Sequence, residues 1–132
     1  MAVNPVVRYM ILCEDWSTAP DRPRRVSIHG LLSNIYSVEQ PPYPLNYKEL
    51  CVFLALTEGR GTGIVQIVGV FEETGQTIFE TPQHQVDLGT DPLEVVGLPF
   101  RIRDCCFPHP GMYSVHFWYN GEKMEERPLR LR

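Results

Sequence analysis

The side chains best suited to chemistry form one short cluster, Cys105-Cys106-Phe107-Pro108-His109, with His116 a little further along the chain. Thiolate and imidazole groups are the usual ligands of zinc, and a cysteine beside a histidine can act as a nucleophile. Structural zinc sites, however, present two ligand pairs, and adjacent cysteines on a strand point to opposite faces. A thiol- or metal-dependent small enzyme or sensor built on Cys105, Cys106, His109 and His116 is therefore the alternative hypothesis.

Other catalytic motifs lack the context that their chemistry requires. The stretch Gly59-Arg60-Gly61-Thr62-Gly63 has the glycines of a phosphate-binding loop, but the apolar residues after it indicate a strand rather than a helix. A hairpin tip is the simpler interpretation. No Gly-x-Ser-x-Gly nucleophile motif occurs. The sequence therefore gives no catalytic, cofactor-binding or metal-binding assignment.

Two basic clusters, at residues 22–25 and 127–132, carry most of the arginines that could contact phosphates. The whole chain has 12 Lys and Arg against 16 Asp and Glu, a net charge of −4. Because the field of the whole molecule opposes a polyanion, we expect no nucleic-acid partner.

Three aromatic residues are the ones least expected to lie wholly in a core: Trp118, Tyr43 and Trp16. Trp118 falls on the face of its predicted strand opposite Tyr113 and Phe117, where its large amphipathic ring suits a partner surface. Coverage of that ring by the chain itself, through the proline-rich segment at residues 41–44, is the favoured interpretation, because loops commonly shelter such rings. These three aromatics are the candidate interaction surface.

The elements that must position all these residues are β-strands. Ten Gly and twelve Pro are spread along the chain, and between them recur short runs of β-branched and aromatic residues, which is typical of an all-β sandwich or barrel. The predicted strands cover residues 6–13, 26–38 (one strand, or two broken at Gly30), 50–57, 64–72, 77–81, 93–102, 113–119 and 122–131. Residues 14–25 and 82–92 are predicted loops.

Two pairs of these strands are predicted hairpins, 50–57 with 64–72 and 113–119 with 122–131. The second is the stronger prediction, because Asn120-Gly121 tolerates the positive φ values of a type I′ turn. The preceding Pro110-Gly111-Met112-Tyr113 is similar to the corner of immunoglobulin-like sandwiches, where a tyrosine hydroxyl binds nearby backbone.

Composition agrees with one globular domain over residues 1–132, since 43% of the residues are hydrophobic and 21% are charged. No secretory signal is recognised at the start, and every apolar run is too short to cross a bilayer as a helix. The four cysteines are then expected to be free thiols, mostly buried. We expect a soluble, cytoplasmic protein that does not enter a membrane.

Short motifs along nearly the whole chain carry a family resemblance. They are Leu12-Cys13-Glu14-Asp15, Ser27-Ile28-His29-Gly30-Leu31, Asn34-Ile35-Tyr36, Phe53-Leu54-Ala55-Leu56-Thr57-Glu58-Gly59 with Gly61, Phe107-Pro108-His109-Pro110-Gly111-Met112-Tyr113, Asn120-Gly121 and Pro128-Leu129. With them the chain resembles a group of small uncharacterised bacterial all-β proteins classed as a domain of unknown function. The resemblance implies a compact β fold in a bacterial cytoplasm and no known activity or cofactor. The Cys105-Cys106 pair departs from that pattern.

Together these observations predict a single antiparallel β-sandwich of about seven to eight strands, immunoglobulin-like in outline. The leading functional hypothesis is a non-catalytic protein-binding or assembly module that uses exposed loops or an edge strand to contact another protein or a second copy of itself. A small-molecule pocket between the sheets is a weaker third possibility.

Overall fold

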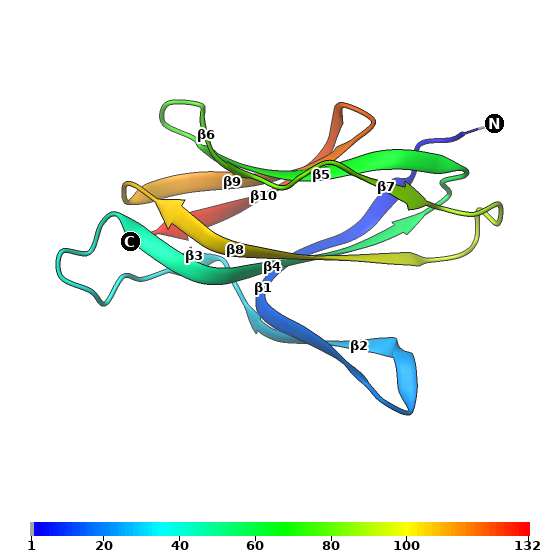
Figure 1. Ribbon diagram of the computed structural model, residues 1–132, viewed down its shortest axis with the longest axis horizontal. Helices are drawn as coiled ribbons and strands as arrows, with labels where there is room; N and C mark the ends of the chain where they lie inside the picture. The colour runs from blue at the N-terminus through cyan, green and yellow to red at the C-terminus, as the bar shows by residue number, and fades with distance from the viewer. Residues whose placement is uncertain (1) are drawn as a thin grey trace.

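The computed structural model describes residues 2–132, with the side chain of Arg24 outside that description, and folds them into two β-sheets (Figure 1). The strands are β1 (Val6–Ala19), β2 (Arg22–Leu31), β3 (Asn34–Ile35), β4 (Leu45–Thr57), β5 (Thr62–Phe71), β6 (Gln76–Glu80), β7 (His84–Asp87), β8 (Val96–Phe107), β9 (Gly111–Tyr119) and β10 (Glu122–Leu131). Residues 2–132 contain no helix, so none that could cross a membrane. The all-β prediction is confirmed.

The four-stranded sheet has the order β2-β1-β4-β8, and the six-stranded sheet has the order β3-β10-β9-β5-β6, with β7 paired to β5. All pairs are antiparallel except β3 with β10. Ten strands are found in residues 2–132, more than the seven or eight predicted, because β3 and β7 are short and lie in segments predicted as strand ends or loop. The immunoglobulin-like outline stays a prediction.

A long hairpin projects from the four-stranded sheet (Figure 1). It is formed by the far half of β1 and by β2, and we call residues 14–31 the arm. The prediction of a loop over residues 14–25 is wrong, because β1 continues to Ala19 and β2 already begins at Arg22. Pro23 is compatible with β2 because an edge strand tolerates a missing N–H.

The predicted hairpin between residues 50–57 and 64–72 is also wrong. The corresponding strands β4 and β5 lie in different sheets. The backbone between them binds another loop: Glu58 N–H donates to the carbonyl of Pro92 at 2.9 Å, and Gly61 N–H donates to the carbonyl of Gly89 at 3.0 Å. These bonds turn the glycine-rich segment into a crossing between the sheets.

The hairpin of β9 and β10 is confirmed, with φ of 50° at Asn120 and 76° at Gly121. The tyrosine contact is confirmed as well, since the Tyr113 hydroxyl donates to the carbonyl of His109 at 2.6 Å. Residues 82–92 differ from the prediction because they contain β7.

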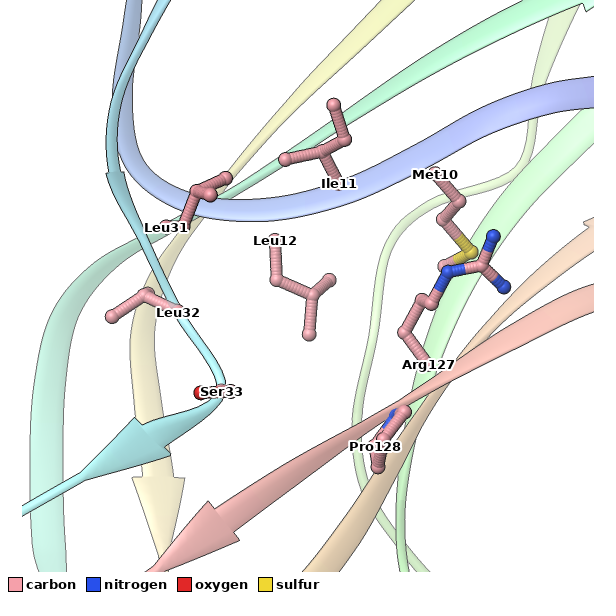
Figure 2. Close-up of a pocket in the computed structure, with 8 residues that line it drawn as sticks. All are labelled: Met10, Ile11, Leu12, Leu31, Leu32, Ser33, Arg127 and Pro128. Atoms are coloured by element: carbon pink, nitrogen blue, oxygen red, sulfur yellow. The ribbon is translucent and has the colours of Figure 1, made fainter.

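One side of the molecule has two strand edges that face each other across an opening (Figure 2). Over residues 6–12, β1 pairs only with β4, and β10 meets β3 only at Arg130 and Leu131. The opening between these edges has a volume of about 390 Å³. Its lining includes Met10 and Leu12 of β1 and Arg127 and Pro128 of β10.

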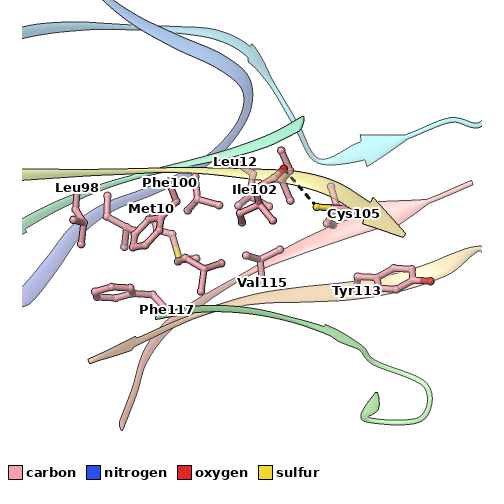
Figure 3. Close-up of a cluster of buried hydrophobic side chains, with 14 of the residues drawn as sticks. Met10, Leu12, Leu98, Phe100, Ile102, Cys105, Tyr113, Val115 and Phe117 are labelled. Carbon is pink, nitrogen blue, oxygen red and sulfur yellow. Dashed lines mark hydrogen bonds between the residues drawn. The ribbon is translucent and has the colours of Figure 1, made fainter. Parts of the chain in front are cut away.

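The core lies between the inner faces of the two sheets (Figure 3). On β9 the face opposite Trp118 enters the core, and all four of its residues are buried: Tyr113, Val115, Phe117 and Tyr119. In β1 the register shifts between Val7 and Tyr9, which moves the following side chains to the other face. Met10 and Leu12 therefore enter the core, and Tyr9 is left 62% exposed although its own face is apolar.

Candidate functional site

The three aromatics predicted as one interaction surface lie in three separate places. Trp16 is on the arm, and Trp118 is on the outer face of the six-stranded sheet, opposite Gln66 and Lys123. Tyr43 packs against the core close to Tyr113, at the other end of β9 from Trp118. The proline-rich segment that carries Tyr43 therefore does not cover the Trp118 ring.

Trp16 borders a groove between the arm and the outer face of the four-stranded sheet. The groove has a volume of about 950 Å³. Its walls include Trp16, Thr18 and Val26 from the arm and Tyr9, Phe53 and Val95 from the sheet side. We call this the arm groove. Its most exposed apolar side chains are Tyr9 at 62% and Val95 at 61%.

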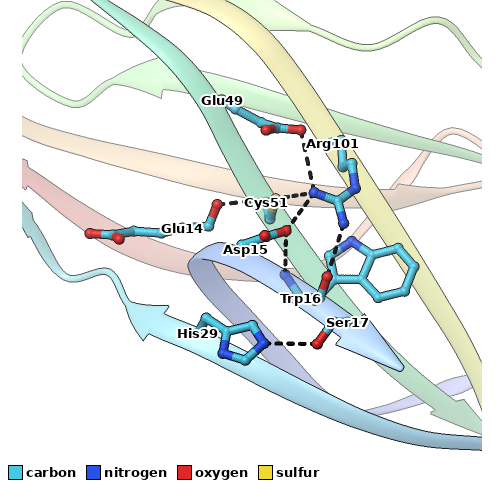
Figure 4. Close-up of polar contacts among 8 residues, drawn as sticks. All are labelled: Glu14, Asp15, Trp16, Ser17, His29, Glu49, Cys51 and Arg101. Atoms are coloured by element: carbon cyan, nitrogen blue, oxygen red, sulfur yellow. Dashed lines mark hydrogen bonds and ion pairs between the residues drawn. The ribbon is translucent and has the colours of Figure 1, made fainter. Parts of the chain in front are cut away.

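Arg101 of β8 holds the start of the arm against the sheet (Figure 4). We call Asp15 and Trp16, the arm residues that it contacts, the root of the arm. Its Nη1 lies 2.6 Å from Asp15 Oδ1 and 3.4 Å from Glu49 Oε1, and its Nη2 donates to the carbonyl of Trp16 at 2.9 Å. The guanidinium also lies 4.8 Å from the centre of the Trp16 ring, a cation–π distance. The Trp16 ring packs on Phe53 with centroids 6.4 Å apart.

The charges at the root stabilise each other. The hydrogen bond from Arg101 holds the pKa of the Asp15 carboxyl below its ordinary value, and the backbone N–H of Trp16 donates a second hydrogen bond to the same carboxylate. The same ion pair raises the pKa of Arg101. Asp15 is thus a fixed anion that orients the arm rather than a proton donor.

Two cysteines lie under this root. Cys13 of β1 lies opposite Cys51 of β4 in the strand register, and both are free thiols that are fully buried. Burial raises the pKa of Cys13 to about 11 and also raises that of Cys51. At neutral pH both are protonated, so they act as small apolar side chains.

A serine–histidine pair on the arm has the distance of a catalytic dyad. Ser17 Oγ lies 2.8 Å from His29 Nε2. A working triad also needs a carboxylate on the other imidazole nitrogen, and in the described part of the chain no hydrogen bond joins His29 to an acid. Asp15 is engaged by Arg101 and by the Trp16 N–H instead. The pair is exposed and lacks the shielding that catalysis requires.

The thiol and histidine residues of the alternative hypothesis are not brought together. Cys105 is buried in the core, where burial raises its pKa to about 12, and Cys106 is exposed on the opposite face. The His109 ring packs on Phe71 at 5.8 Å. His116 lies on the outer face of the other sheet. Within residues 2–132, no group of three His, Cys, Asp or Glu side chains is placed to hold a metal ion.

His116 belongs instead to a polar network on the six-stranded sheet. Glu126 Oε2 accepts a hydrogen bond from Ser114 Oγ at 2.9 Å and lies 3.2 Å from His116 Nε2 and 3.5 Å from Lys123 Nζ. The Ser114 bond lowers the pKa of Glu126, and burial lowers the pKa of His116. The network satisfies its own polar groups, whereas the Nε1–H of Trp118 on the same face is buried without an acceptor.

Arg101 is the main residue that sequence reasoning missed. Its partner Asp15 lies 86 positions away, so no local pattern joins the two. One signal was present: Arg101 stands between the apolar residues Phe100 and Ile102, which places a charge on the outer face of a strand.

Comparisons with known proteins bear on the family and the fold. A model described as a family of unknown function, DUF6941, matches residues 8–132. The chain belongs to this family. The resemblance found in the sequence is thereby confirmed, apart from the bacterial origin, which stays a prediction. No curated protein matches significantly.

Among solved structures, the chain is similar to part of the alkylpurine DNA glycosylase AlkC of Pseudomonas fluorescens, with 15% identity and a TM-score of 0.53 over 97% of this chain and 30% of that one. It is also similar to part of a beta-glucosidase from Listeria innocua, with 12% identity and a TM-score of 0.50 over 93% of this chain and 16% of that one. The chain spans less than a third of either protein. At these identities the likeness shows the fold alone.

Proposed function

We propose that this protein is a non-catalytic protein-binding module and that the arm groove is its binding surface. The proposal depends on one observation: over residues 9–13, directly after the register shift, β1 is apolar on both faces. An antiparallel strand with a solvated face alternates apolar and polar residues, so a strand apolar on both faces is typical of one covered on both sides. The arm covers part of the outer face, and Tyr9 and Val95 remain exposed. A bound partner would cover them.

The chemistry of the groove favours a polypeptide with apolar side chains. The rings of Tyr9, Trp16 and Phe53 offer the large, rigid contact area that protein interfaces use. Glu94 also lines the groove, and with the net charge of −4 it disfavours nucleic acid.

The arginine clusters do not reverse this inference. In the cluster at residues 127–132, Arg127 is paired with Glu125 at 3.0 Å. In the cluster at residues 22–25, the Arg24 side chain lies outside the described residues. A cytoplasmic location is part of the proposal, supported by the four free thiols.

The test places a photo-crosslinking amino acid at position 9 in the arm groove and, as a matched control, at position 36. Tyr36 is 63% exposed and lies outside the groove. In cells that make the protein naturally, we expect one partner to crosslink at position 9 and not at position 36. That partner, or a second copy of the chain, is then purified and its affinity measured.

Substitution separates a specific contact from incidental proximity. The Tyr9→Ser change is expected to weaken binding about tenfold or more, because a buried interface aromatic carries a large share of the energy, and Tyr36→Ser to leave it unchanged. Equal effects of the two changes contradict the proposal. A strict monomer in light scattering together with no adduct at position 9 contradicts it as well.

A further inference from the structure

A second site lies at the opening between the sheets, on the side of β1 away from the arm groove. Met10 and Leu12 form its floor and are almost fully buried, at 3% and 4% exposed (Figure 2). Leu31 stands at its margin with 75% of its surface exposed. The lining is therefore mostly apolar, with Arg127 and Ser33 as polar members.

The edge of β1 beside this opening has unpaired backbone groups. The Leu12 carbonyl faces this side, because it accepts the N–H of Leu32 at 2.9 Å. Backbone groups of a strand alternate in direction, so the N–H and carbonyl of Met10 face the same side. No strand of the described chain pairs with β1 there, since residues 6–12 pair only with β4. Buried backbone groups without partners are costly, and a ligand can supply the missing bonds.

The facing edge of β10 is closed by its own side chains. Pro128 has no N–H to offer. The N–H of Glu126 donates to Glu125 Oε1 at 3.1 Å, and the Glu126 carbonyl accepts from Arg127 Nη1 at 2.7 Å. Of the two edges at the opening, β1 is the one that offers both N–H and carbonyl groups.

We infer that the edge of β1 accepts an extended segment of another polypeptide as an added strand, with an apolar side chain of that segment in the opening. An extended backbone presents N–H and carbonyl groups at the spacing that the N–H and carbonyl of Met10 and the N–H of Leu12 require. The free edge runs from the register shift after Val7 to Leu12, whose carbonyl is already bound by Leu32, which suits about four residues of partner. This site is independent of the arm groove, because Tyr9 faces the groove and Met10 and Leu12 face the opening.

The test uses a library of heptapeptides in which Val, Leu, Ile or Phe alternates with Thr. Amide exchange of Met10 and Leu12 is followed by NMR on the full chain. Without peptide we expect both amides to exchange quickly. With a binding peptide we expect them to be protected at least tenfold, while amides in β10 are unchanged. Protection already complete in the free monomer overturns the inference, and so does a library in which no member protects these amides.

N-methylation of the selected peptide tests the strand pairing itself. Methyl groups on alternate nitrogens remove the donors on one edge of the peptide strand only. One methylation pattern is expected to abolish binding and the complementary pattern to retain it. Equal loss with both patterns overturns the inference, because it indicates binding through side chains alone.

Two exposed leucines supply matched variants. Leu31→Glu places a charge at the opening and is expected to weaken peptide binding at least tenfold. Leu93→Glu, at a position 85% exposed and outside the opening, is expected to leave binding unchanged. Protection of Met10 and Leu12 that rises with protein concentration and needs no peptide would identify a second copy as the occupant and overturn this inference. Tyr9→Ser leaves peptide binding intact, so the result is read separately from that of the arm groove.

Discussion

The outer faces of the two sheets carry opposite kinds of side chain, polar on one and apolar on the other. The six-stranded sheet presents Ser114, His116, Lys123 and Glu126, whose polar groups meet at the Glu126 carboxylate. The four-stranded sheet presents apolar side chains in the arm groove, and a cluster of polar contacts lies beside them at Arg101. A self-satisfied polar face needs no cover, and an apolar face does. The comparison supports the proposal that a partner binds on the four-stranded sheet.

The two tryptophans show the same difference. Trp118 stands beside a polar network that already has its partners. Trp16 stands in a groove between two walls and is held by Arg101. The two tryptophans are the same residue type but have different surroundings. The residues packed around each ring therefore decide whether it is available to a partner.

The largest expected effect is that of Arg101→Ala. The change removes the ion pair with Asp15 and the bond to the Trp16 carbonyl, and we expect it to lower the free energy of unfolding by about 1–2 kcal/mol, reduced by the exposure of the pair. Urea denaturation measures the loss. In a Trp118→Phe background, Trp16 emission should shift to longer wavelength. Arg103→Ala, on the same face of β8, is the control and is expected to change stability by less than about 0.5 kcal/mol.

A smaller loss is expected for Glu126→Ala, at the centre of the other face. Ser114 and His116 lose their shared acceptor, which should cost about 1 kcal/mol of unfolding free energy. Trp16 emission and binding in the arm groove should not change. A shift in either would show that the two outer faces are coupled and would break the comparison.

The polar face should also carry a pH dependence. Because burial lowers the pKa of His116, its contribution is complete above the ordinary histidine value of about 6.5 and is lost as the pH falls through the lower folded value. Thermal unfolding from about pH 8 down to pH 5 should show a falling midpoint, and His116→Asn should flatten that fall. A slope unchanged in the variant would assign it to another group.

The smallest expected effect concerns the reactivity of the four cysteines, all of which lie in the four-stranded sheet. Three of the four are buried, and Cys106 is exposed. A thiol reagent should therefore label one cysteine in the folded protein and all four after denaturation. Cys106→Ser should leave none labelled before unfolding. Fast labelling of Cys105 would revive the thiol hypothesis.

The parts of the fold that sequence predicts well are those with local signals. Asn120-Gly121 and the alternation before it determine the β9–β10 hairpin, because turn chemistry and periodicity agree there. The glycines at 59–63 gave a signal that was equally local but ambiguous. A hairpin tip and a crossing between sheets use the same residues, and the outcome was decided by bonds to residues 89–92.

The arm and its groove escaped prediction because distant residues make them. Residues 14–25 have the charges and prolines of a loop, yet they pair across the arm and are held by Arg101. The one-residue register shift near Arg8 reversed which face of β1 enters the core. The pattern of apolar residues in the sequence does not indicate such a shift. Trp16 was therefore found as a candidate residue, and its setting was not.

The parallel contact of β3 with β10 ties a segment near the start of the chain to one near its end, through bonds such as Arg130 N–H to the Ser33 carbonyl at 2.9 Å. During translation β3 is synthesised long before β10. During synthesis the four-stranded sheet can pair its strands, but its inner face is not fully covered until the last hairpin emerges. Late emergence of that hairpin makes translation the period in which this chain most needs protection from aggregation.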